Sequence, residues 1–574
     1  MNTPVETNQI VTQFINTLKY LEIDTVFGIV GIPIVTLAND MIKNGIKFVS
    51  FRNEQAASYA ASAYGYLTGK PGILLTVGGP GLIHAMSGIY NSINNRWPMI
   101  VISGSNGNSN DQYKGAFQEL DQISLLNKYV KFCGRLNPEN IQQLLFQCYN
   151  LSIQGTLGVT YLDFPGNLIE DLSIGSNDLR SNQRLQTNLP PIPKRIKYCP
   201  DPHIVKNVCK LLLEHRDKEI LVVVGKGSQP AFKEMNQFIN IFQLPFLPTP
   251  MGKGVVSDLN PLNVSSARSL VMKRATLVLV FGARLNWILH YGEPPRWNSD
   301  AIFVQCDHTP ETLGHNNIAG LQYSLCGDIN LTLKELIFEL TRLNFKYHGI
   351  KKEIKDKIKS NEQRLTDLEV SACRALYNAE GKMEMNYHSV YRTIRELMDL
   401  TNTFLVTEGA NTMDKARISF PCLKPKSRLD AGTNATMGVG LGYSIAAKLY
   451  SKEKDVVLIQ GDSAFGFSGM ELETITRSKL GIVIVIMNNS GIYHGCGSES
   501  ATKLSEHCRY DLVAKGLGSK GYLITTLDEL KVGFRKALVD SRTKRVTTLL
   551  NVIISHGNNK TVRFAWQNKP NAKL

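Results

Sequence analysis

Two apolar segments in the C-terminal part of the sequence end in residues that could bind a metal. DVVLIQ (455–460) leads into Asp462, and a β-branched run over 481–487 leads into Asn489. If both segments are neighbouring parallel strands, their carboxyl ends lie at the same edge of a sheet, where open α/β folds bind ligands. A carboxylate and an amide oxygen at that edge are suited to Mg²⁺ that is also held by a phosphate.

A helix is predicted between these strands, over residues 468–479, with Ser468 as its N-cap. The segment would then be a strand–helix–strand unit. A simpler explanation of the same residues remains open, in which Asp462 caps the helix and Asn488-Asn489 form a turn.

A second candidate is Glu54, which follows an apolar strand over 47–51 and begins a helix of small residues in FRNEQAASYAASAYGYLTGKPG. A carboxylate in this position could take part in proton transfer. Taken alone, it could equally be a first-turn glutamate favoured by the helix dipole.

Together these segments resemble the thiamine-diphosphate-dependent enzymes. GDSAFGFSGMELET and MNNSGIYHG (from 461 and 487) are similar to the motif of the subgroup that contains 2-hydroxyacyl-CoA lyase and oxalyl-CoA decarboxylase, including a fungal peroxisomal member. RNEQAA, with FGIVGIP before it and GGPGLIHA after it, is similar to the family's pyrimidine-binding domain.

The resemblance implies a role for each of these residues. Asp462, Asn489 and the main-chain carbonyl of Gly491 would bind Mg²⁺, and the backbone around Ser463 and Ala464 would contact the cofactor diphosphate. Glu54 would be the activating carboxylate, which shifts the aminopyrimidine ring to the imino tautomer that deprotonates the thiazolium C2.

Two further segments refine the resemblance. In GAFQELDQ (115–122), Phe117 and Gln118 would face the reaction centre, and this pair favours the lyases, since the decarboxylases tend to have Tyr-Glu. In AGTNATMGVGLGY (431–443), Met437 would be the apolar wedge that keeps the cofactor bent, and the carbonyl of Ala435 would accept from the pyrimidine amino group.

The second of these segments also departs from the family. Asn434-Ala435 stands where relatives have an aromatic residue followed by glycine, which affects the expected pocket shape and chain-length preference. Ordinary core packing is the alternative role for Met437.

The middle of the chain resembles the CoA-binding part of the subgroup. Ala267 and Arg268 match positions that contact CoA, and Arg417 is a second candidate for its phosphates, because a guanidinium pairs bidentately with phosphate oxygens. For either arginine a plain surface role is an equal alternative. Some family members bind ADP here, and the matching strand-end positions are Lys226, Asp307 and Asp328.

The elements that would position these residues alternate between strands and helices, which predicts an α/β fold with mainly parallel sheets. We expect three doubly wound domains: a pyrimidine-binding domain (1–178), a central CoA- and nucleotide-contacting domain (200–340) and a diphosphate- and Mg-binding domain (385–574). A polar, proline-containing linker is expected over 176–200, and a solvated connecting helix over 350–366.

Composition excludes several other classes. The chain has 574 residues, a net charge of +15 spread along its length, and 43% hydrophobic residues. No basic cluster indicates nucleic-acid binding, and no apolar stretch approaches the roughly 18–20 residues of a membrane span. The ten cysteines form no CxxC pair, which favours a reducing compartment.

The leading hypothesis is therefore a lyase that cleaves 2-hydroxyacyl-CoA into a shortened aldehyde and formyl-CoA, for use in fatty acid α-oxidation. The alternatives are an oxalyl-CoA decarboxylase, which gives formyl-CoA and CO₂, and a non-catalytic paralogue that serves as an assembly or regulatory subunit. A homodimer or homotetramer is expected, because the two half-sites lie in different domains and the family pairs them across subunits.

The last three residues, Ala572-Lys573-Leu574, form a variant of the Ser-Lys-Leu peroxisomal address read by an import receptor. No secretory signal competes with it. We expect a peroxisomal protein with some of it left in the cytoplasm; an ordinary frayed basic tail is the alternative.

Overall fold

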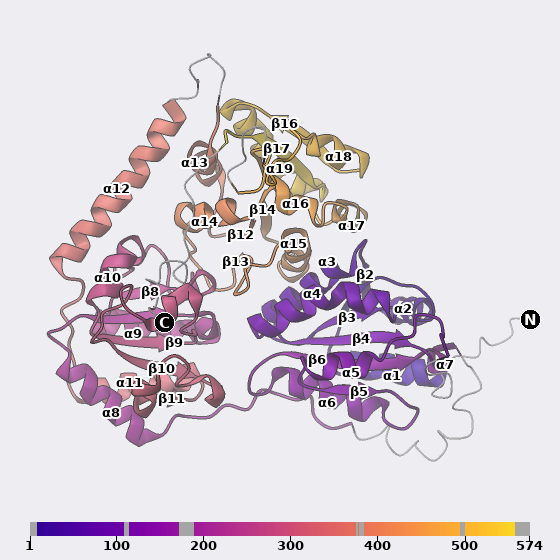
Figure 1. Cartoon of the computed structure of the whole chain (residues 1–574), viewed down its shortest axis with the longest axis horizontal. Coiled ribbons are helices and arrows are strands. Elements are labelled where there is room, and N and C mark those ends of the chain that lie inside the picture. Colours follow the sequence, from indigo (N-terminus) through magenta and orange to yellow (C-terminus); the bar gives the residue numbers. More distant parts are fainter. Residues whose placement is uncertain are drawn as a thin grey trace, which may run out of the picture.

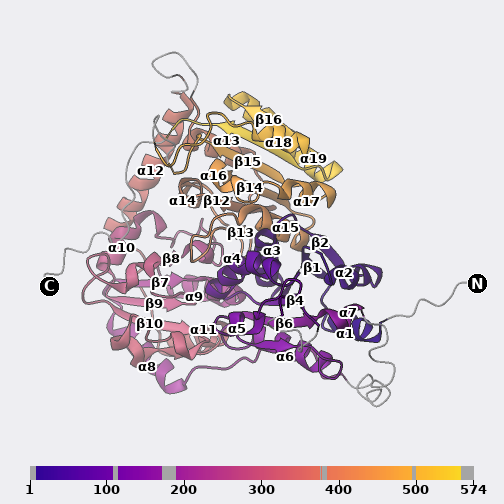
Figure 2. The same ribbon diagram turned by 45° about the vertical axis from the view of Figure 1, so that its right-hand side comes forward.

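The computed structural model describes residues 8–107, 114–170, 189–374, 377, 384–493 and 500–556. These residues form three domains, each built on a parallel β-sheet flanked by helices (Figures 1 and 2). The predicted fold class, three doubly wound parallel-sheet domains, is confirmed. Of the expected linker, residues 189–200 are described, and they contain no helix or strand.

The N-terminal domain has a six-stranded sheet of order β2-β1-β3-β4-β6-β5. Its elements are α1 (Gln9–Tyr20), β1 (Thr25–Gly28), α2 (Ile34–Lys43), β2 (Lys47–Ser50), α3 (Glu54–Thr68), β3 (Gly72–Thr76), α4 (Pro80–Asn95), β4 (Met99–Ser105), α5 (Gln122–Asn127), β5 (Cys133–Arg135), α6 (Ile141–Ile153), β6 (Val159–Pro165) and α7 (Gly166–Glu170).

The central domain has a five-stranded sheet of order β11-β10-β9-β7-β8 and a hydrophobic core of its own. Its elements are α8 (Pro202–Glu214), β7 (Ile220–Val224), α9 (Phe232–Phe242), β8 (Phe246–Pro248), α10 (Arg268–Arg274), β9 (Leu277–Phe281), β10 (Ile302–Asp307), β11 (Leu325–Cys326) and α11 (Ile329–Arg342), with short 3₁₀ turns between them.

The C-terminal domain repeats the six-stranded pattern, with strand order β13-β12-β14-β15-β17-β16. Its elements are α13 (Tyr387–Leu397), β12 (Thr403–Glu408), α14 (Ala410–Ser419), β13 (Arg428–Leu429), α15 (Gly440–Tyr450), β14 (Asp455–Gly461), α16 (Asp462–Gly466), α17 (Glu471–Arg477), β15 (Val483–Asn488), α18 (Tyr510–Gly516), β16 (Lys520–Ile524), α19 (Leu527–Lys544) and β17 (Thr548–Ile553).

The inner strands of this sheet are buried and mainly apolar, with polar residues at their ends, because helices cover both of their faces. β14 and β15 are buried at every position and pair in register from Val457↔Val483 to Gly461↔Met487. Their carboxyl ends therefore lie next to each other, as the strand pattern predicts.

The N- and C-terminal domains share one hydrophobic core, in which α3 packs against α15. Both views show these two helices side by side between the sheets (Figures 1 and 2). Tyr443 of α15 contacts the rings of Tyr59 and Trp97, with centroids 6.4 and 5.4 Å apart. A Cβ added at Gly442 would lie 2.6 Å from the carbonyl oxygen of Ala56, so the two backbones approach closely here.

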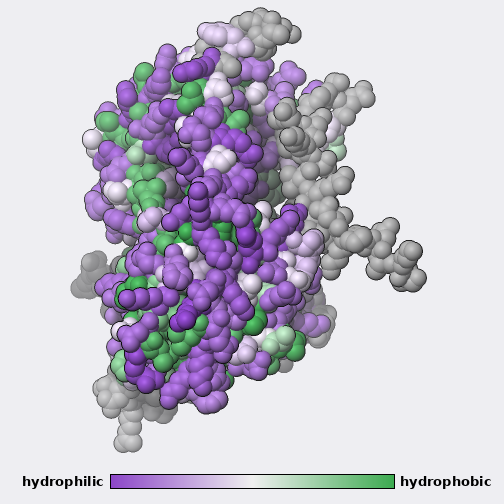
Figure 3. All heavy atoms as spheres, turned by 90° about the vertical axis from the view of Figure 1, so that its left-hand side faces the viewer, coloured by the Kyte–Doolittle hydropathy of each residue, from purple (hydrophilic) through white to green (hydrophobic). Residues whose placement is uncertain are grey.

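A long charged helix, α12 (Lys352–Arg374), connects the central and C-terminal domains and contains the helix expected over 350–366. The face that carries α12 and the central domain is mainly hydrophilic, with hydrophobic side chains scattered among the polar ones (Figure 3). Within the described ranges, no helix combines the length and the apolar character that crossing a membrane requires.

The contact between α3 and α15 generates a prediction. Gly442→Ala should lower the free energy of unfolding by about 1–3 kcal/mol, because its methyl group would collide with the backbone of α3. Gly516→Ala, in a helix with open space at that position, is the matched control and should leave stability unchanged or raise it by up to about 1 kcal/mol. Urea unfolding followed by circular dichroism measures both; equal effects would contradict the close approach.

Candidate active site

The structure brings Asp462 and Asn489 together at the carboxyl edge of the C-terminal sheet. Asp462 directly follows β14 and Asn489 directly follows the neighbouring β15, and each is 2% exposed. The Asp462 carboxylate accepts hydrogen bonds from the N–H of Ser463 (2.8 Å) and the N–H of Gly491 (3.1 Å). Gly491 thus lies beside Asp462, and the role of its carbonyl as a metal ligand stays a prediction.

The chemistry of this donor set fits Mg²⁺. Asn489 uses its amide nitrogen to donate to the carbonyl of Tyr493 (3.3 Å), which leaves the amide oxygen as its metal-binding atom. Burial raises the pKa of Asp462 to about 6, although the N–H groups around it act in the opposite direction. A cation beside this carboxylate would offset the cost of burying its charge.

The helix expected over 468–479 is present but shorter, as α17 (Glu471–Arg477). A separate short helix, α16, precedes the expected range, and residues 467–470 lie between the two helices. The two glycines Gly466 and Gly469 account for the break, because glycine is a poor helix former. Ser468 caps no helix; its hydroxyl donates to the carbonyl of Gly438 (3.2 Å).

The turn that carries Met437 is held by a buried carboxylate, Glu408, at the end of β12. Its oxygens accept hydrogen bonds from the backbone N–H groups of residues 438–440, at 3.2 Å for Val439 and 2.6 Å for Gly440. The side-chain amide of Gln460, opposite it on β14, donates to the same carboxylate at 2.6 Å. Glu408 is fully buried.

Helix α4 of the N-terminal domain holds the other end of this turn. Asn91 accepts from the hydroxyl of Thr436 (3.0 Å), and Asn95 accepts from the N–H of Thr433 (3.1 Å). Ala435 is exposed and has φ +50°, a conformation that glycine adopts more easily. The departure from the expected glycine therefore falls on a strained position.

Glu54 is the first residue of α3 and is 9% exposed. The preceding residue, Asn53, caps the helix by accepting from the N–H of Gln55 (2.8 Å). One Glu54 carboxylate oxygen lies 3.3 Å from Nδ1 of His84, and the other would lie 3.4 Å from a Cβ added at Gly81.

Phe117 and Gln118 line a cavity of about 340 Å³ in the N-terminal domain. Its wall also includes Ile32, Pro33 and Ser105. Phe117 is 68% exposed, and Gln118 has φ +52°. The structure thus places both residues at a hollow in the surface of the N-terminal domain, and their place at a reaction centre stays a prediction.

The residues expected to contact CoA differ in whether they are buried and whether their side chains already have partners within the protein. Ala267 is buried, and Arg268 donates to the carbonyl of Ile288 (2.6 Å). Arg417 forms hydrogen-bonded ion pairs with Asp430 and Asp414, both at 2.9 Å. Arg417 thus has a structural role, because it links α14 to the residue that follows β13. A phosphate would have to compete with these two aspartates for its guanidinium group.

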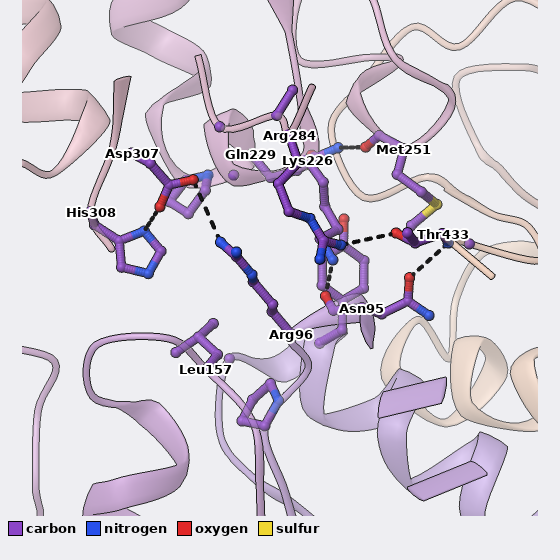
Figure 4. A pocket seen from close by; sticks show the side chains of 18 of the residues that line it. Asn95, Arg96, Leu157, Lys226, Gln229, Met251, Arg284, Asp307, His308 and Thr433 are labelled. Carbon is purple, nitrogen blue, oxygen red and sulfur yellow. Dashed lines mark hydrogen bonds and ion pairs between the residues drawn. The ribbon is translucent and has the colours of Figure 1, made fainter. Parts of the chain in front are cut away.

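A second cavity, of about 400 Å³, lies where the three domains meet (Figure 4). Six lysine and arginine side chains but only two aspartates are among its lining residues. Burial, together with Arg96, lowers the pKa of Arg284 to about 10, and burial holds the pKa of Lys226 well below its usual value. Such a lining suits an anionic ligand.

Two of the three residues expected to contact ADP line this cavity. Asp307 pairs with His308 (3.4 Å) and Arg96 (3.7 Å), and Lys226 donates to the carbonyl of Asn95 (Figure 4). Asp328 is not among the lining residues; its carboxylate accepts from the N–H of Tyr198 (3.1 Å).

Sequence reasoning missed Glu408, Gln460, His84 and Glu471. Glu408 and Gln460 each end an apolar strand run, TFLVTE and DVVLIQ, and that position was the signal that could have found them. His84 and Glu471 sit within helices, and no local pattern marks them.

Glu408→Gln tests how the Met437 turn is held. Both Glu408 oxygens keep lone pairs for their N–H donors even in the protonated acid, whereas the NH₂ group of glutamine accepts none, so the free energy of unfolding at pH 5 should fall by about 1–3 kcal/mol. Burial raises the pKa of Glu408 from 4.5 to about 7. The part of the stability linked to this group is therefore present below pH 4.5 and lost as the pH rises to about 7.

The stability difference between wild type and Glu408→Gln should accordingly narrow from pH 4.5 to pH 7, as measured by urea unfolding at several pH values. A difference that widens with pH would mean that the N–H donors outweigh burial at Glu408.

Comparison with known proteins identifies the family that has this three-domain architecture. The family of thiamine pyrophosphate enzymes matches in three parts: its N-terminal TPP binding domain at residues 8–125, its central domain at 205–336 and its C-terminal TPP binding domain at 408–552.

Individual relatives match over nearly the whole chain. A 2-hydroxyacyl-CoA lyase of Saccharomyces cerevisiae is 55% identical over 97% of this chain and 98% of its own length. The 2-hydroxyacyl-CoA lyase 1 of Homo sapiens is 37% identical, with 96% of each chain covered, and the oxalyl-CoA decarboxylase of Escherichia coli K12 is 36% identical, with 94% of each covered. The chain therefore belongs to the thiamine pyrophosphate enzymes, within the group of 2-hydroxyacyl-CoA lyases and oxalyl-CoA decarboxylases.

Proposed function

We propose that the protein cleaves the C1–C2 bond of 2-hydroxyacyl-CoA and releases formyl-CoA and an aldehyde shortened by one carbon. The observation that carries the proposal is that buried Glu54 and the buried pair Asp462 and Asn489 occur together in a chain so similar to 2-hydroxyacyl-CoA lyases. A non-catalytic subunit would need none of these three buried polar side chains.

Thiamine diphosphate, when bound, supplies the electron sink for breaking the carbon–carbon bond. The residues of this chain would bind and orient it. Asp462, Asn489 and the Gly491 carbonyl would hold Mg²⁺, and the backbone around Ser463 and Ala464 would contact the diphosphate. All of these groups lie at the ends of β14 and β15.

Glu54 would hold a proton at the aminopyrimidine nitrogen. Glu54 is buried at the start of α3, and Asn53 caps this helix. The carboxyl group therefore projects from a fixed helix end, as proton transfer requires. Met437 would support the bent cofactor from below, and the carbonyl of Ala435 would accept from the amino group.

The substrate would enter through the cavity that Phe117 and Gln118 line. Apolar Phe117, Ile32 and Pro33 would exclude water from the aldehyde portion, and the Gln118 amide would hydrogen-bond the polar end. The Phe-Gln pair favours the lyase over the decarboxylase.

Positive charge supports a CoA-binding role for the region of Ala267 and Arg268. Burial, together with the positive charges of Arg268 and Arg296, lowers the pKa of His290 to about 4. A phosphate group would reduce this repulsion. Arg417 would bind a phosphate of CoA only if that phosphate took the place of one of its two aspartate partners.

A homodimer or homotetramer is part of the proposal. Glu54 belongs to the first domain and the metal-binding residues to the third. Large apolar side chains near both half-sites are exposed in the single chain, among them Tyr90 (53%), Phe467 (53%) and Met470 (53%). A second copy would bury them.

Glu54→Gln tests the proposed mechanism. The amide cannot exchange a proton with the pyrimidine nitrogen, so kcat for formyl-CoA release from 2-hydroxyacyl-CoA should fall by at least about 10²-fold. Calorimetry should show thiamine diphosphate and Mg²⁺ still binding, because Glu54 holds neither the metal nor the diphosphate. Near wild-type turnover by this variant would rule the mechanism out.

The same assay with oxalyl-CoA in place of 2-hydroxyacyl-CoA separates the two enzyme classes. If the protein releases CO₂ from oxalyl-CoA faster than it cleaves 2-hydroxyacyl-CoA, the protein is an oxalyl-CoA decarboxylase and not a lyase. Absence of cofactor binding to the wild-type protein would leave the non-catalytic alternative.

We also propose import into peroxisomes through Ala572-Lys573-Leu574, which lie outside the described residues. A fluorescent protein fused to the N-terminus leaves this end free. Deletion of Leu574 should then change punctate fluorescence to diffuse cytoplasmic fluorescence, because the receptor reads the terminal residue. Puncta that persist after the deletion would show that this tail is not the address.

A further inference from the structure

Glu471 links the C-terminal domain to the residues that immediately precede Glu54. It is the first residue of α17 and is 1% exposed. Its carboxylate accepts hydrogen bonds from the backbone N–H of Arg52 (3.1 Å) and that of Asn53 (3.0 Å). These two N–H groups lie between β2 and α3, where no strand or helix partner is available to them.

Other side chains on the same face of α17 reinforce this contact. The Thr474 hydroxyl donates to the Glu471 carboxylate at 2.7 Å and so fixes its orientation. Arg477, a further turn along the helix, donates to the carbonyl of Ser50 at 2.7 Å. Residues three or four apart share one side of a helix, so α17 holds residues 50–53 along its length.

The held segment determines the direction of Glu54. Asn53 is the N-cap of α3, and Glu54 is the next residue. Because the cap sets where a helix begins and how its first turn is oriented, a displacement of Asn53 displaces the Glu54 carboxyl group. Phe51 in the same loop belongs to the apolar core shared by the two domains and contacts the ring of Phe27, with centroids 6.2 Å apart. The core therefore holds residue 51, and Glu471 holds the backbone of the two residues that follow it.

We propose that Glu471 is a positioning residue for Glu54: by accepting the N–H groups of Arg52 and Asn53, it aims the Glu54 carboxyl group at the cofactor's pyrimidine ring. The proposal rests on the role assigned to Glu54 under the proposed function. The contact also links the loop before Glu54 to the segment that follows Asp462 in the same chain.

The test uses two substitutions of graded effect in the full-length protein. Glu471→Gln retains one acceptor oxygen, and Glu471→Leu retains none at a similar volume. The measured quantity is the rate at which the C2 proton of bound thiamine diphosphate exchanges for deuterium, followed by acid quench and NMR. Calorimetry with thiamine diphosphate and Mg²⁺ gives the cofactor Kd for each variant.

We expect exchange to slow by at least about 10-fold in Glu471→Leu, since misplacing a catalytic group by 1 Å can cost about 10²-fold. Glu471→Gln should slow exchange less, because one carboxylate oxygen accepts both N–H groups and the amide oxygen can take its place as a weaker, neutral acceptor. The cofactor Kd should stay within about 3-fold of wild type, because the hydrogen-bond partners of the Glu471 carboxylate, Arg52, Asn53 and Thr474, are not expected to bind the diphosphate or the metal. If Glu471→Leu does not fold, Glu471→Ala, which also has no acceptor, takes its place.

Glu369→Gln is the matched control for lost stability. Glu369 is another buried glutamate, 3% exposed and paired with both terminal nitrogens of Arg395 on α13. Its substitution should lower the melting temperature and leave C2 exchange at the wild-type rate. A slowing of exchange equal to that in Glu471→Gln would attribute the effect to stability and overturn the positioning role.

Glu54→Gln distinguishes the two proposals. If it exchanges at the wild-type rate, the proposed function itself fails. If it does not exchange while both Glu471 variants exchange like wild type, only the positioning role fails.

Discussion

Three buried carboxylates determine where the functional loops of this protein lie. Burial penalises the ionised form and raises the pKa of Glu408 and of Glu471 to about 7 and that of Asp462 to about 6. Each carboxylate accepts from backbone N–H groups of a turn or loop, which lack partners in regular secondary structure. The cost of burial is thereby offset by groups that would otherwise be unsatisfied, and each loop is fixed to a strand end or a helix start.

The strand ends that carry Asp462 and Asn489 could be predicted from the sequence, because buried parallel strands are largely apolar runs that stop at polar residues. Asp462 and Asn489 were found in this way, and the structure places them side by side. Glu54 and the Phe117-Gln118 pair were recognised only by resemblance, since a glutamate in a first helical turn and a phenylalanine in a loop have many ordinary explanations.

Other features could not be predicted because their partners are distant in sequence. Glu471 and Arg52 are 419 positions apart, and nothing near either residue indicates the other. Arg417 has the composition of a phosphate ligand, but its pairing with Asp430 depends on how β13 lies beside α14. Ser468 has the composition of an N-cap, but its hydroxyl donates to the distant carbonyl of Gly438, which is likewise a tertiary contact.

The core shared by the first and third domains has a consequence for biosynthesis. The central domain has its own core and can form as soon as its residues have been made, whereas the side of α3 that packs against α15 stays uncovered until α15 has been made. Thr68 ends α3 and Tyr450 ends α15. At translation rates of about 5–20 residues per second, this surface waits roughly 20–75 s on the ribosome for its partner, a period in which chaperones can bind it.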